Sequence, residues 1–299
     1  MQRRDFIRNS VLSAVAISAT GFIRFDGNKY VGDCETTTDI IGPYYRPNSP
    51  VRNNFVIPGK EGQLVELTGM IKHKDCVTPY PKAKIELWHC DNMGVYDNDS
   101  DEMRYRGTSY SDENGNYSFK TIFPVAYPIG DTGFTRPAHF HLMITAEGYQ
   151  PLVTQLYFTG DKYIDGDVSA RLPQAKRRIL DIQKLKDGTQ KVLFDVSMSE
   201  SLAADPSAID KLTGEYAAIQ DPSKKMLFFK RDDALWLKNE VYGVNFDYAG
   251  NNTFYYAGMP RGTDDSLQFK ILPNGPIELT ATFVRLDGTK NVVVFRKEK

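Results

Sequence analysis

The sequence predicts an all-β protein with two domains, and three observations lead to this prediction. Tyrosine and phenylalanine are frequent, at 17 residues each, in a chain of 299 residues that glycine and proline interrupt often. Short stretches of alternating apolar and polar residues recur along the chain, separated by turn residues. These stretches form two groups, with a β-sandwich expected over residues 29–198 and a second small antiparallel β domain over residues 213–299.

The composition limits the classes of function. Hydrophobic residues make up 41% and charged residues 25% of the chain, which is ordinary for a soluble globular protein. The formal net charge is -1, so no strongly basic field indicates nucleic acid as a partner. Nucleic acid is therefore not an expected partner.

The first 28 residues differ from the rest. Arg3 and Arg4 precede a mildly apolar stretch that runs from Val11 to Phe22. This pattern resembles a bacterial twin-arginine export signal and predicts a periplasmic location, and the alternative is a short amphipathic helix or an arm. The apolar stretch is too short and too weak for a stable membrane span.

The chain has three cysteines, so at least one of them has no intrachain partner. In an exported protein one possibility is a disulfide between Cys76 and Cys90, because they flank one expected turn and strand. The alternative is that these cysteines are buried thiols. Cys34 precedes an irregular arm rich in Pro, Thr and Asn.

The first domain reads as strands separated by turns. Residues 63–91 predict two strands with a loop around Pro79 and Pro81. Asn114 and Gly115 lie between two strand-like stretches and predict a hairpin. We expect further strands over 137–146, 151–159 and 190–197, and a short helix over 174–184.

The second domain follows a segment of small and polar residues, 199–212, that predicts a linker. Beyond it, short aromatic strands recur every eight to twelve residues, with turn signals such as Asp287–Gly288. This predicts a sandwich or a half-open barrel. The segment has no histidine and no cysteine, so its sequence indicates no metal site and no cysteine nucleophile. Three roles stay open for it, which are covering an active site, mediating association and binding a polymer.

His139 and His141 are two of only four histidines, and they lie one residue apart. Within a strand they project from the same face, with Phe140 on the other, and two neighbouring imidazoles suit one Fe, Zn, Cu or Ni ion. The alternative is two surface or core histidines. His73 and His89 lie in separate strand patterns, and we expect them to face solvent or to form hydrogen bonds.

The motifs that name a reaction directly are missing: H-E-x-x-H, C-x-x-C, a Gly-rich phosphate loop and G-x-S-x-G. A zinc hydrolase that uses the two histidines is a weak alternative, because no carboxylate base has a suitable spacing.

From about residue 34 to about residue 163 the chain resembles the intradiol ring-cleavage dioxygenases, such as catechol 1,2-dioxygenase and protocatechuate 3,4-dioxygenase. The matching segments occur in the order and at the spacing typical of that family. They are IIGPYYRP, ELWHCDNMGVYDN, RGTSYSDENGNYSFKTIFPVAYPI, RPAHFHLMI and VTQLYFTGD.

The resemblance implies one mononuclear non-haem Fe(III) held by Tyr96, Tyr127, His139 and His141. Phenolate oxygen is a hard anionic donor that suits ferric iron, and coordination lowers the tyrosine pKa far below its ordinary value of about 10. Taken alone, either tyrosine would be one ordinary loop or core residue among 17.

The resemblance also implies the reaction, which is cleavage of a catechol-type aromatic by O2 to a cis,cis-muconate-type diacid. The substrate would displace Tyr127, which then acts as a base. Arg136 would stabilise developing negative charge, and Gln155 would lie near the O2 site. Taken alone, these two residues would form a surface ion pair and a strand hydrogen bond. Substrate preference would depend on Tyr44, Tyr45 and the 98–106 loop.

The chain departs from the family at both ends. The helical N-terminal region through which many catechol 1,2-dioxygenases dimerise is missing, so a homo-oligomer would need another interface. The C-terminal β domain is not part of the usual enzyme. The alternative function is a non-enzymatic transthyretin-like or carboxypeptidase-regulatory-like β-sandwich binding module, which lacks the Tyr-Tyr-His-His set.

Overall fold

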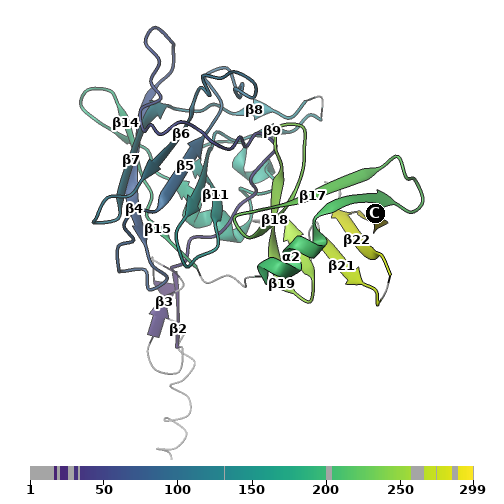
Figure 1. The fold of residues 1–299 in the computed structure, drawn as a ribbon. Coiled ribbons are helices and arrows are strands. Elements are labelled where there is room, and N and C mark those ends of the chain that lie inside the picture. The colour runs from purple at the N-terminus through teal and green to yellow at the C-terminus, as the bar shows by residue number, and fades with distance from the viewer. Residues whose placement is uncertain are drawn as a thin grey trace, which may run out of the picture.

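A computed structural model describes residues 17–18, 21–25, 30–32, 34–130, 132–199, 204–256, 266–273, 275–284 and 289–298. Strands dominate these residues, so the predicted all-β class is confirmed (Figure 1). Most of the expected export signal lies outside the described residues, as does the Asp287–Gly288 turn. The described parts near the N-terminus form a small sheet of β1 (Ile17–Ser18), β2 (Gly21–Phe25) and β3 (Tyr30–Gly32). Among the described helices, none has the length and apolar character of a membrane span.

The first domain is a sandwich of two five-stranded sheets. One sheet has the order β12 (Ile179–Leu180), β11 (Leu152–Phe158), β10 (Phe140–Thr145), β5 (Lys84–Trp88) and β6 (Arg106–Tyr110). The other has the order β13 (Gln183–Lys184), β14 (Gln190–Leu193), β4 (Leu64–Lys72) and β15 (Val196–Ser197), and β7 (Asn116–Ile122) also pairs with β4. The two sheets enclose one hydrophobic core.

Alternation along the strands decides which side chains enter that core. On β4 every second residue is buried, as expected for a strand with one face toward the core. On β10, Phe140, Leu142 and Ile144 belong to the core between the sheets. Met143, on the opposite face, belongs to a separate cluster outside the sandwich. The two histidines share the face of Met143 by the same alternation, so they project away from the sandwich core.

The predicted hairpin at Asn114–Gly115 is wrong. The residues do form a tight turn, in which the Asp112 carbonyl accepts from the Gly115 amide at 2.9 Å. However, β6 pairs with β5 and β7 pairs with β4, so the turn carries the chain from one sheet to the other. Gly115 has φ +77° and a Cβ there would lie 2.6 Å from the Ile71 carbonyl oxygen, so glycine is required by the crossing onto β4.

The short helix expected over 174–184 is mostly wrong. A 3-10 helix, η3, covers Pro173–Arg178, and the chain then enters β12 and β13. β12 runs parallel to the end of β11, with Tyr157 opposite Ile179. Pairing with an existing sheet edge therefore overrides the local helical preference of this segment.

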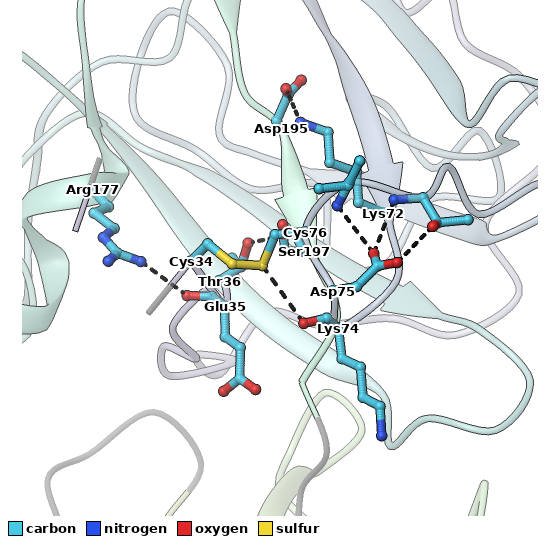
Figure 2. The surroundings of a disulfide bond; sticks show 12 residues. Cys34, Glu35, Thr36, Lys72, Lys74, Asp75, Cys76, Arg177, Asp195 and Ser197 are labelled. Carbon is cyan, nitrogen blue, oxygen red and sulfur yellow. Dashed lines mark hydrogen bonds and ion pairs between the residues drawn. A yellow bond between two sulfur atoms is a disulfide. The ribbon is translucent and has the colours of Figure 1, made fainter. Parts of the chain in front are cut away.

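Of the two possibilities left open for Cys76 and Cys90, the disulfide between them is not formed, and the buried thiol holds for Cys90 alone. Cys34 bonds to Cys76, with 6.1 Å between the Cα atoms, and Figure 2 shows the bond joining the arm at Glu35 and Thr36 to the loop at Lys74 and Asp75. Cys90 is a buried free thiol whose Sγ lies 3.5 Å from the Val125 carbonyl oxygen. The reason is location, because Cys76 lies in an exposed loop while Cys90 is packed on the outer face of the β5 sheet.

The second domain is a closed antiparallel barrel of eight strands, in which β16 pairs with β23, so the expected half-open form is corrected to a closed one. In chain order the strands are β16 (Gly214–Ala218), β17 (Lys225–Arg231), β18 (Ala234–Leu237), β19 (Val244–Gly250), β20 (Thr253–Tyr256), β21 (Ser266–Ile271), β22 (Ile277–Val284) and β23 (Lys290–Lys297). Its core includes Phe228, Leu235 and Phe269.

The segment expected to be a linker, 199–212, contains helix α2 (Pro206–Leu212). The Asp205 carboxylate caps this helix by accepting from the Ser207 amide at 2.8 Å. Ile209 and Leu212 are buried in the barrel core. The second half of the expected linker is therefore part of the barrel domain, which lies beside the sandwich with β18 on the facing side (Figure 1).

Candidate active site

Four side chains implied by the family resemblance meet on the outer face of the β5–β10–β11 sheet. Tyr96 comes from the loop between β5 and β6, and Tyr127 from β8 (Tyr127–Pro128). His139 directly precedes β10 and His141 lies on it. All four are buried, with Tyr127 the most exposed at 9% and His139 the least at 1%.

The polar atoms of Tyr96, His139 and His141 lie within hydrogen-bond distance of one another, and the Tyr127 ring adjoins them. The Nε2 atoms of His139 and His141 are 3.1 Å apart. The Tyr96 phenol oxygen lies 3.3 Å from His139 Nε2 and 3.1 Å from His141 Nε2. The Tyr127 ring centroid is 5.6 Å from both the Tyr96 and the His139 ring centroids. Residues separated by up to 45 positions thus form one cluster.

The two imidazoles are oriented as metal ligands would be. His139 Nδ1 lies 2.6 Å from the Pro137 carbonyl oxygen, which only accepts, so Nδ1 carries the hydrogen and the Nε2 lone pair points into the cluster. The His141 ring stacks on Trp88, at 4.9 Å between centroids and 9° between planes. His141 Nδ1 is buried and has no hydrogen-bond partner among the described residues, so Nε2 is its atom directed at the cluster.

Burial sets the electrostatics of these groups. It raises the pKa of Tyr127 to about 12 and that of Tyr96 well above the usual range. Burial, followed by the Arg136 charge, lowers the pKa of His139 to about 3. Burial, followed by His139, lowers the pKa of His141 well below its ordinary value. The cluster therefore keeps two neutral imidazoles with free lone pairs, and a bound cation would favour the phenolate forms of the tyrosines. Two nitrogen and two oxygen donors of this kind fit a ferric ion.

Arg136 lies across a two-stranded ladder from Tyr127, on β9 (Thr135–Arg136). Its Nε donates to Asp167 at 2.5 Å, and its Nη2 donates to Gln155 at 2.9 Å and to the Tyr157 hydroxyl at 3.2 Å. Burial alone would lower the Arg136 pKa, but Tyr157 and Asp167 outweigh it and raise that pKa. A fixed positive charge thus lies beside the cluster.

Gln155 lies opposite His141 in the β10–β11 ladder and is fully buried. Its carbonyl oxygen accepts from Arg136, and its amide nitrogen donates to the Ile40 carbonyl at 2.5 Å. Gln155 therefore connects the arginine to the N-terminal arm.

A buried ion pair behind Arg136 escaped the sequence reasoning. Arg178 of η3 contacts the Asp39 carboxylate of the arm, and both side chains are at most 1% exposed. The Tyr157 hydroxyl donates to Asp39 at 3.0 Å, and Ser169 also donates to Asp39. Asp39 directly precedes the matching segment IIGPYYRP, but a single acidic residue in an irregular arm forms no pattern.

Tyr44, expected near the substrate, stacks on Tyr96 with 4.5 Å between ring centroids. The guanidinium carbon of Arg106 lies 6.0 Å from the centroid of the Tyr96 ring. The same guanidinium donates to the Tyr44 carbonyl at 2.6 Å. Tyr45 lies deeper and donates its hydroxyl to Glu86 at 3.2 Å. Only Tyr44 of the expected pair thus adjoins the four-residue cluster directly.

The other two histidines form hydrogen bonds elsewhere. His73 Nδ1 lies 2.8 Å from the Tyr149 hydroxyl, and His89 Nε2 lies 2.8 Å from the Thr121 hydroxyl. Within the described part of the chain, no three His, Cys, Asp or Glu side chains are grouped so that they could hold a metal ion. The candidate centre depends on its two tyrosines.

A protein-family model described as Dioxygenase matches residues 40–199, which is more than half of the chain. The chain belongs to the intradiol ring-cleavage dioxygenase family. All four residues of the cluster, with Arg136 and Gln155, lie within the matched region. The barrel lies beyond it, so the barrel is an addition to the part of the fold that the family model describes.

Relatives agree with this family assignment. The chain is 35% identical over 154 residues to a chlorocatechol 1,2-dioxygenase of Rhodococcus opacus, covering 44% of this chain and 60% of that protein. It is 30% identical over 214 residues to a catechol 1,2-dioxygenase of Candida albicans, covering 64% and 70%. A solved intradiol ring-cleavage dioxygenase from Tetranychus urticae has a TM-score of 0.51 at 20% identity, covering 57% of this chain and 97% of that one, which shows the shared fold.

Proposed function

We propose that this protein is an Fe(III)-dependent dioxygenase that cleaves a catechol-type aromatic between its two hydroxylated carbons. The observation that carries the proposal is the convergence of the Tyr96 oxygen and the two imidazole Nε2 atoms within 3.3 Å of each other. Tyr127 completes a set of two phenols and two imidazoles, which together would hold one mononuclear non-haem ferric ion. The family membership and the named relatives support the same reaction class.

When bound, the ferric ion would withdraw electron density from a chelated catecholate and so make its ring reactive toward O2. Tyr127 is the most exposed of the four residues, at 9%, and it would act as the base, because in its phenolate form the oxygen can accept a proton from a substrate hydroxyl. Arg136 would hold a positive charge beside the negative charge that develops on the substrate, and Gln155 keeps the Arg136 guanidinium in place. Both atoms of O2 would enter the product, a cis,cis-muconate-type diacid.

The visible spectrum of the iron-loaded protein, before and after addition of catechol without oxygen, tests the proposal. We expect a broad tyrosinate-to-iron charge-transfer band that moves to longer wavelength when catechol is added. A protein that stays colourless after reconstitution with ferric iron would contradict the proposal and favour the binding module.

We also propose that the protein is exported to the periplasm. The paired Arg3 and Arg4 support export, and so does the Cys34–Cys76 disulfide, because such bonds persist in oxidising compartments. Replacement of both arginines by lysine, followed by fractionation of the host cells, should retain the protein in the cytoplasm. Unchanged export of that variant would refute this location.

A further inference from the structure

The barrel and the candidate active site share one hydrophobic cluster. We call it the outer-face cluster, and it lies on the side of the β5–β10–β11 sheet that faces away from the sandwich core. It contains both candidate tyrosine ligands and also Trp236 of β18, which is 2% exposed. Its fully or largely buried members are Ile41, Tyr45, Trp88, Cys90, Tyr96, Tyr127, Met143, Val153 and Trp236.

Within this cluster a series of rings runs from the barrel to a candidate iron ligand. We call Trp236, Tyr45, Trp88 and His141 the ring series. Trp236 lies 5.8 Å from Tyr45, measured between ring centroids. Tyr45 meets Trp88 edge-on at 5.0 Å. Trp88 then stacks on His141 at 4.9 Å with the planes nearly parallel. The plane of the His141 ring is thus set by a neighbour that the barrel supports.

Tyr45 contacts β5 at two points, so its position affects the position of Trp88. Its hydroxyl donates to Glu86 at 3.2 Å, and its ring packs on Trp88, two residues further along the same strand. A movement of Tyr45 would therefore shift the surface on which Trp88, and through it His141, is packed.

Arg231, at the end of β17, fixes Tyr45 from the barrel side. Its guanidinium carbon lies 5.3 Å from the centroid of Tyr45, 5.6 Å from that of Trp236 and 5.3 Å from that of Tyr242. A cation at this distance is attracted to the face of an aromatic ring. The Arg231 side chain is 16% exposed, and its Nε pairs with Asp232 at 3.2 Å.

These contacts are separate from the packing that holds the barrel together. The barrel core includes Phe228, Leu235 and Phe246, whereas Trp236 belongs to the outer-face cluster. Because successive residues of a strand point to opposite faces, Leu235 points into the barrel and Trp236 points out toward the sandwich. Arg231 thus packs at the contact between the two domains and lies outside the barrel core.

We propose that Arg231 is a positioning residue for the active site, which acts through Tyr45 and Trp88 on His141. The barrel would then contribute to the iron site, because it would hold His141 in its orientation through Tyr45 and Trp88. The effect on iron rests on the proposed function, while the effect on Trp88 does not.

The test uses the full chain and the fluorescence of Trp88. Trp88 and Trp236 are the only tryptophans in the sequence, so Trp236→Phe keeps a ring at the interface and leaves Trp88 as the single reporter. In this background we compare Arg231→Gln, Arg231→Lys and the control Arg296→Gln. Arg296 lies in the same barrel, is 54% exposed and pairs with Glu278 at 3.1 Å, away from the ring series.

Two measurements are made on each variant. The first is the emission maximum of Trp88, and its quenching by acrylamide, in the metal-free protein. The second is the rate at which protein loaded with ferric iron alone loses the ion to an excess of chelator. For Arg231→Gln we expect the Trp88 emission to shift to the red and to be quenched more strongly by acrylamide. We also expect iron release to be about three- to tenfold faster. The reason is that changing a group in direct contact with a metal ligand costs about 10–100-fold in metal affinity, and Arg231 acts through two intervening residues. Arg231→Lys, which keeps the charge, should restore part of both signals.

Emission and quenching of Arg231→Gln that match those of Arg296→Gln would overturn the proposal. A lower denaturation midpoint with unchanged emission and iron release would also overturn it, because the role of Arg231 would then be purely structural. If the parent protein takes up no ferric iron, the proposed function fails, and the emission of Trp88 still decides whether Arg231 positions that residue.

Discussion

Tyr96 is the residue on which the candidate metal centre depends most, because its oxygen lies within 3.3 Å of both imidazole Nε2 atoms. Tyr96→Phe removes this oxygen and keeps the ring. We expect it to lower the affinity for ferric iron by at least about tenfold and to remove most of the charge-transfer colour. The measurement is iron content per protein after dialysis, together with the visible spectrum.

The control for this variant is Tyr110→Phe, since Tyr110 lies on β6 and is 51% exposed. His141→Ala should resemble Tyr96→Phe in losing iron and ring cleavage while the fold is kept. Full iron content and full turnover in His141→Ala would show that the ligand set is wrong.

Arg178 and Asp39 form a buried ion pair whose loss should destabilise the whole sandwich. Arg178→Gln leaves the Asp39 carboxylate buried without its cation, which costs about 3–5 kcal/mol of unfolding free energy. Lys176→Gln on the same 3-10 helix is the control, since the side chain is exposed and the change should stay within about 0.5 kcal/mol. Urea unfolding measures the stability of both variants. Equal unfolding midpoints for Arg178→Gln and Lys176→Gln would contradict the expected contribution of the ion pair.

His89 should make the protein sensitive to mild acid. Burial is the largest cause that lowers its pKa, to about 4, from an ordinary value of 6.5. Between these values the unfolded chain binds a proton that the native protein excludes. Stability is therefore complete above pH 6.5 and falls by roughly 3 kcal/mol as the pH drops to 4.

His89→Gln removes this titration, so its stability should depend less on pH between 7 and 5 than that of the parent protein. Urea midpoints at both pH values measure the difference. His73→Gln is the matched control, because His73 is half-buried in the β4–β5 region. A pH slope that is the same in His89→Gln and the parent would show that another group carries the acid sensitivity.

At the residue scale, sequence reasoning located the candidate centre because its residues lie in short, ordered motifs. The spacing of His139 and His141 alone places them on one face of a strand. Tyr96 and Tyr127 came from the family resemblance, since no local pattern distinguishes them among 17 tyrosines. Asp39 and Arg178 were missed because their partnership spans 139 positions and depends on the path of the arm.

At the scale of elements, the N-terminal arm is the segment that joins the parts of the site. It carries Asp39, the Ile40 carbonyl that accepts from Gln155, and Tyr44. The disulfide from Cys34 to Cys76 ties the start of this arm to the loop after β4 (Figure 2). The arm is thus fixed covalently a few residues before it reaches the site.

Removal of this disulfide should destabilise the protein. Cys34 and Cys76 are 42 positions apart, and a loop of that length corresponds to about 4 kcal/mol of unfolding free energy in the chain-entropy account. Cys34→Ser, Cys76→Ser and the double variant should lose similar amounts, because each removes the same bond. Unfolding midpoints under non-reducing conditions measure this, and strictly additive losses would contradict the common cause.

The elements that sequence reasoning misjudged share one physical cause. The Asn114–Gly115 turn and the 174–184 segment have correct local signals, for a tight turn and for a turn of helix. Their strands pair according to the two-sheet arrangement, which joins β7 to β4 and β12 to β11. Local propensity does not contain that information, because it depends on contacts between distant residues.

At the scale of the whole molecule, the sandwich and the barrel should unfold together. They share the outer-face cluster, in which Trp236 of the barrel packs with Tyr45 of the arm. Two domains that share buried apolar surface are coupled by the free energy of that contact. Under the proposed function, ferric iron would bind the native sandwich and not the unfolded chain, so at a free concentration of 100 times its dissociation constant it would add about 2.7 kcal/mol of stability.

In the parent protein this stabilisation should raise the unfolding temperature of both domains in one transition. Trp236→Ala removes the barrel's largest contribution to the shared cluster, so its thermal unfolding should split into two transitions. Iron should then raise only the sandwich transition and leave the barrel transition in place. Differential scanning calorimetry of both proteins, with ferric iron and with chelator, measures this. Since Leu227 on β17 is 40% exposed, Leu227→Ala is the barrel control and should keep one transition. A parent protein that already shows two transitions, with iron moving only one of them, would mean that the shared cluster does not couple the domains.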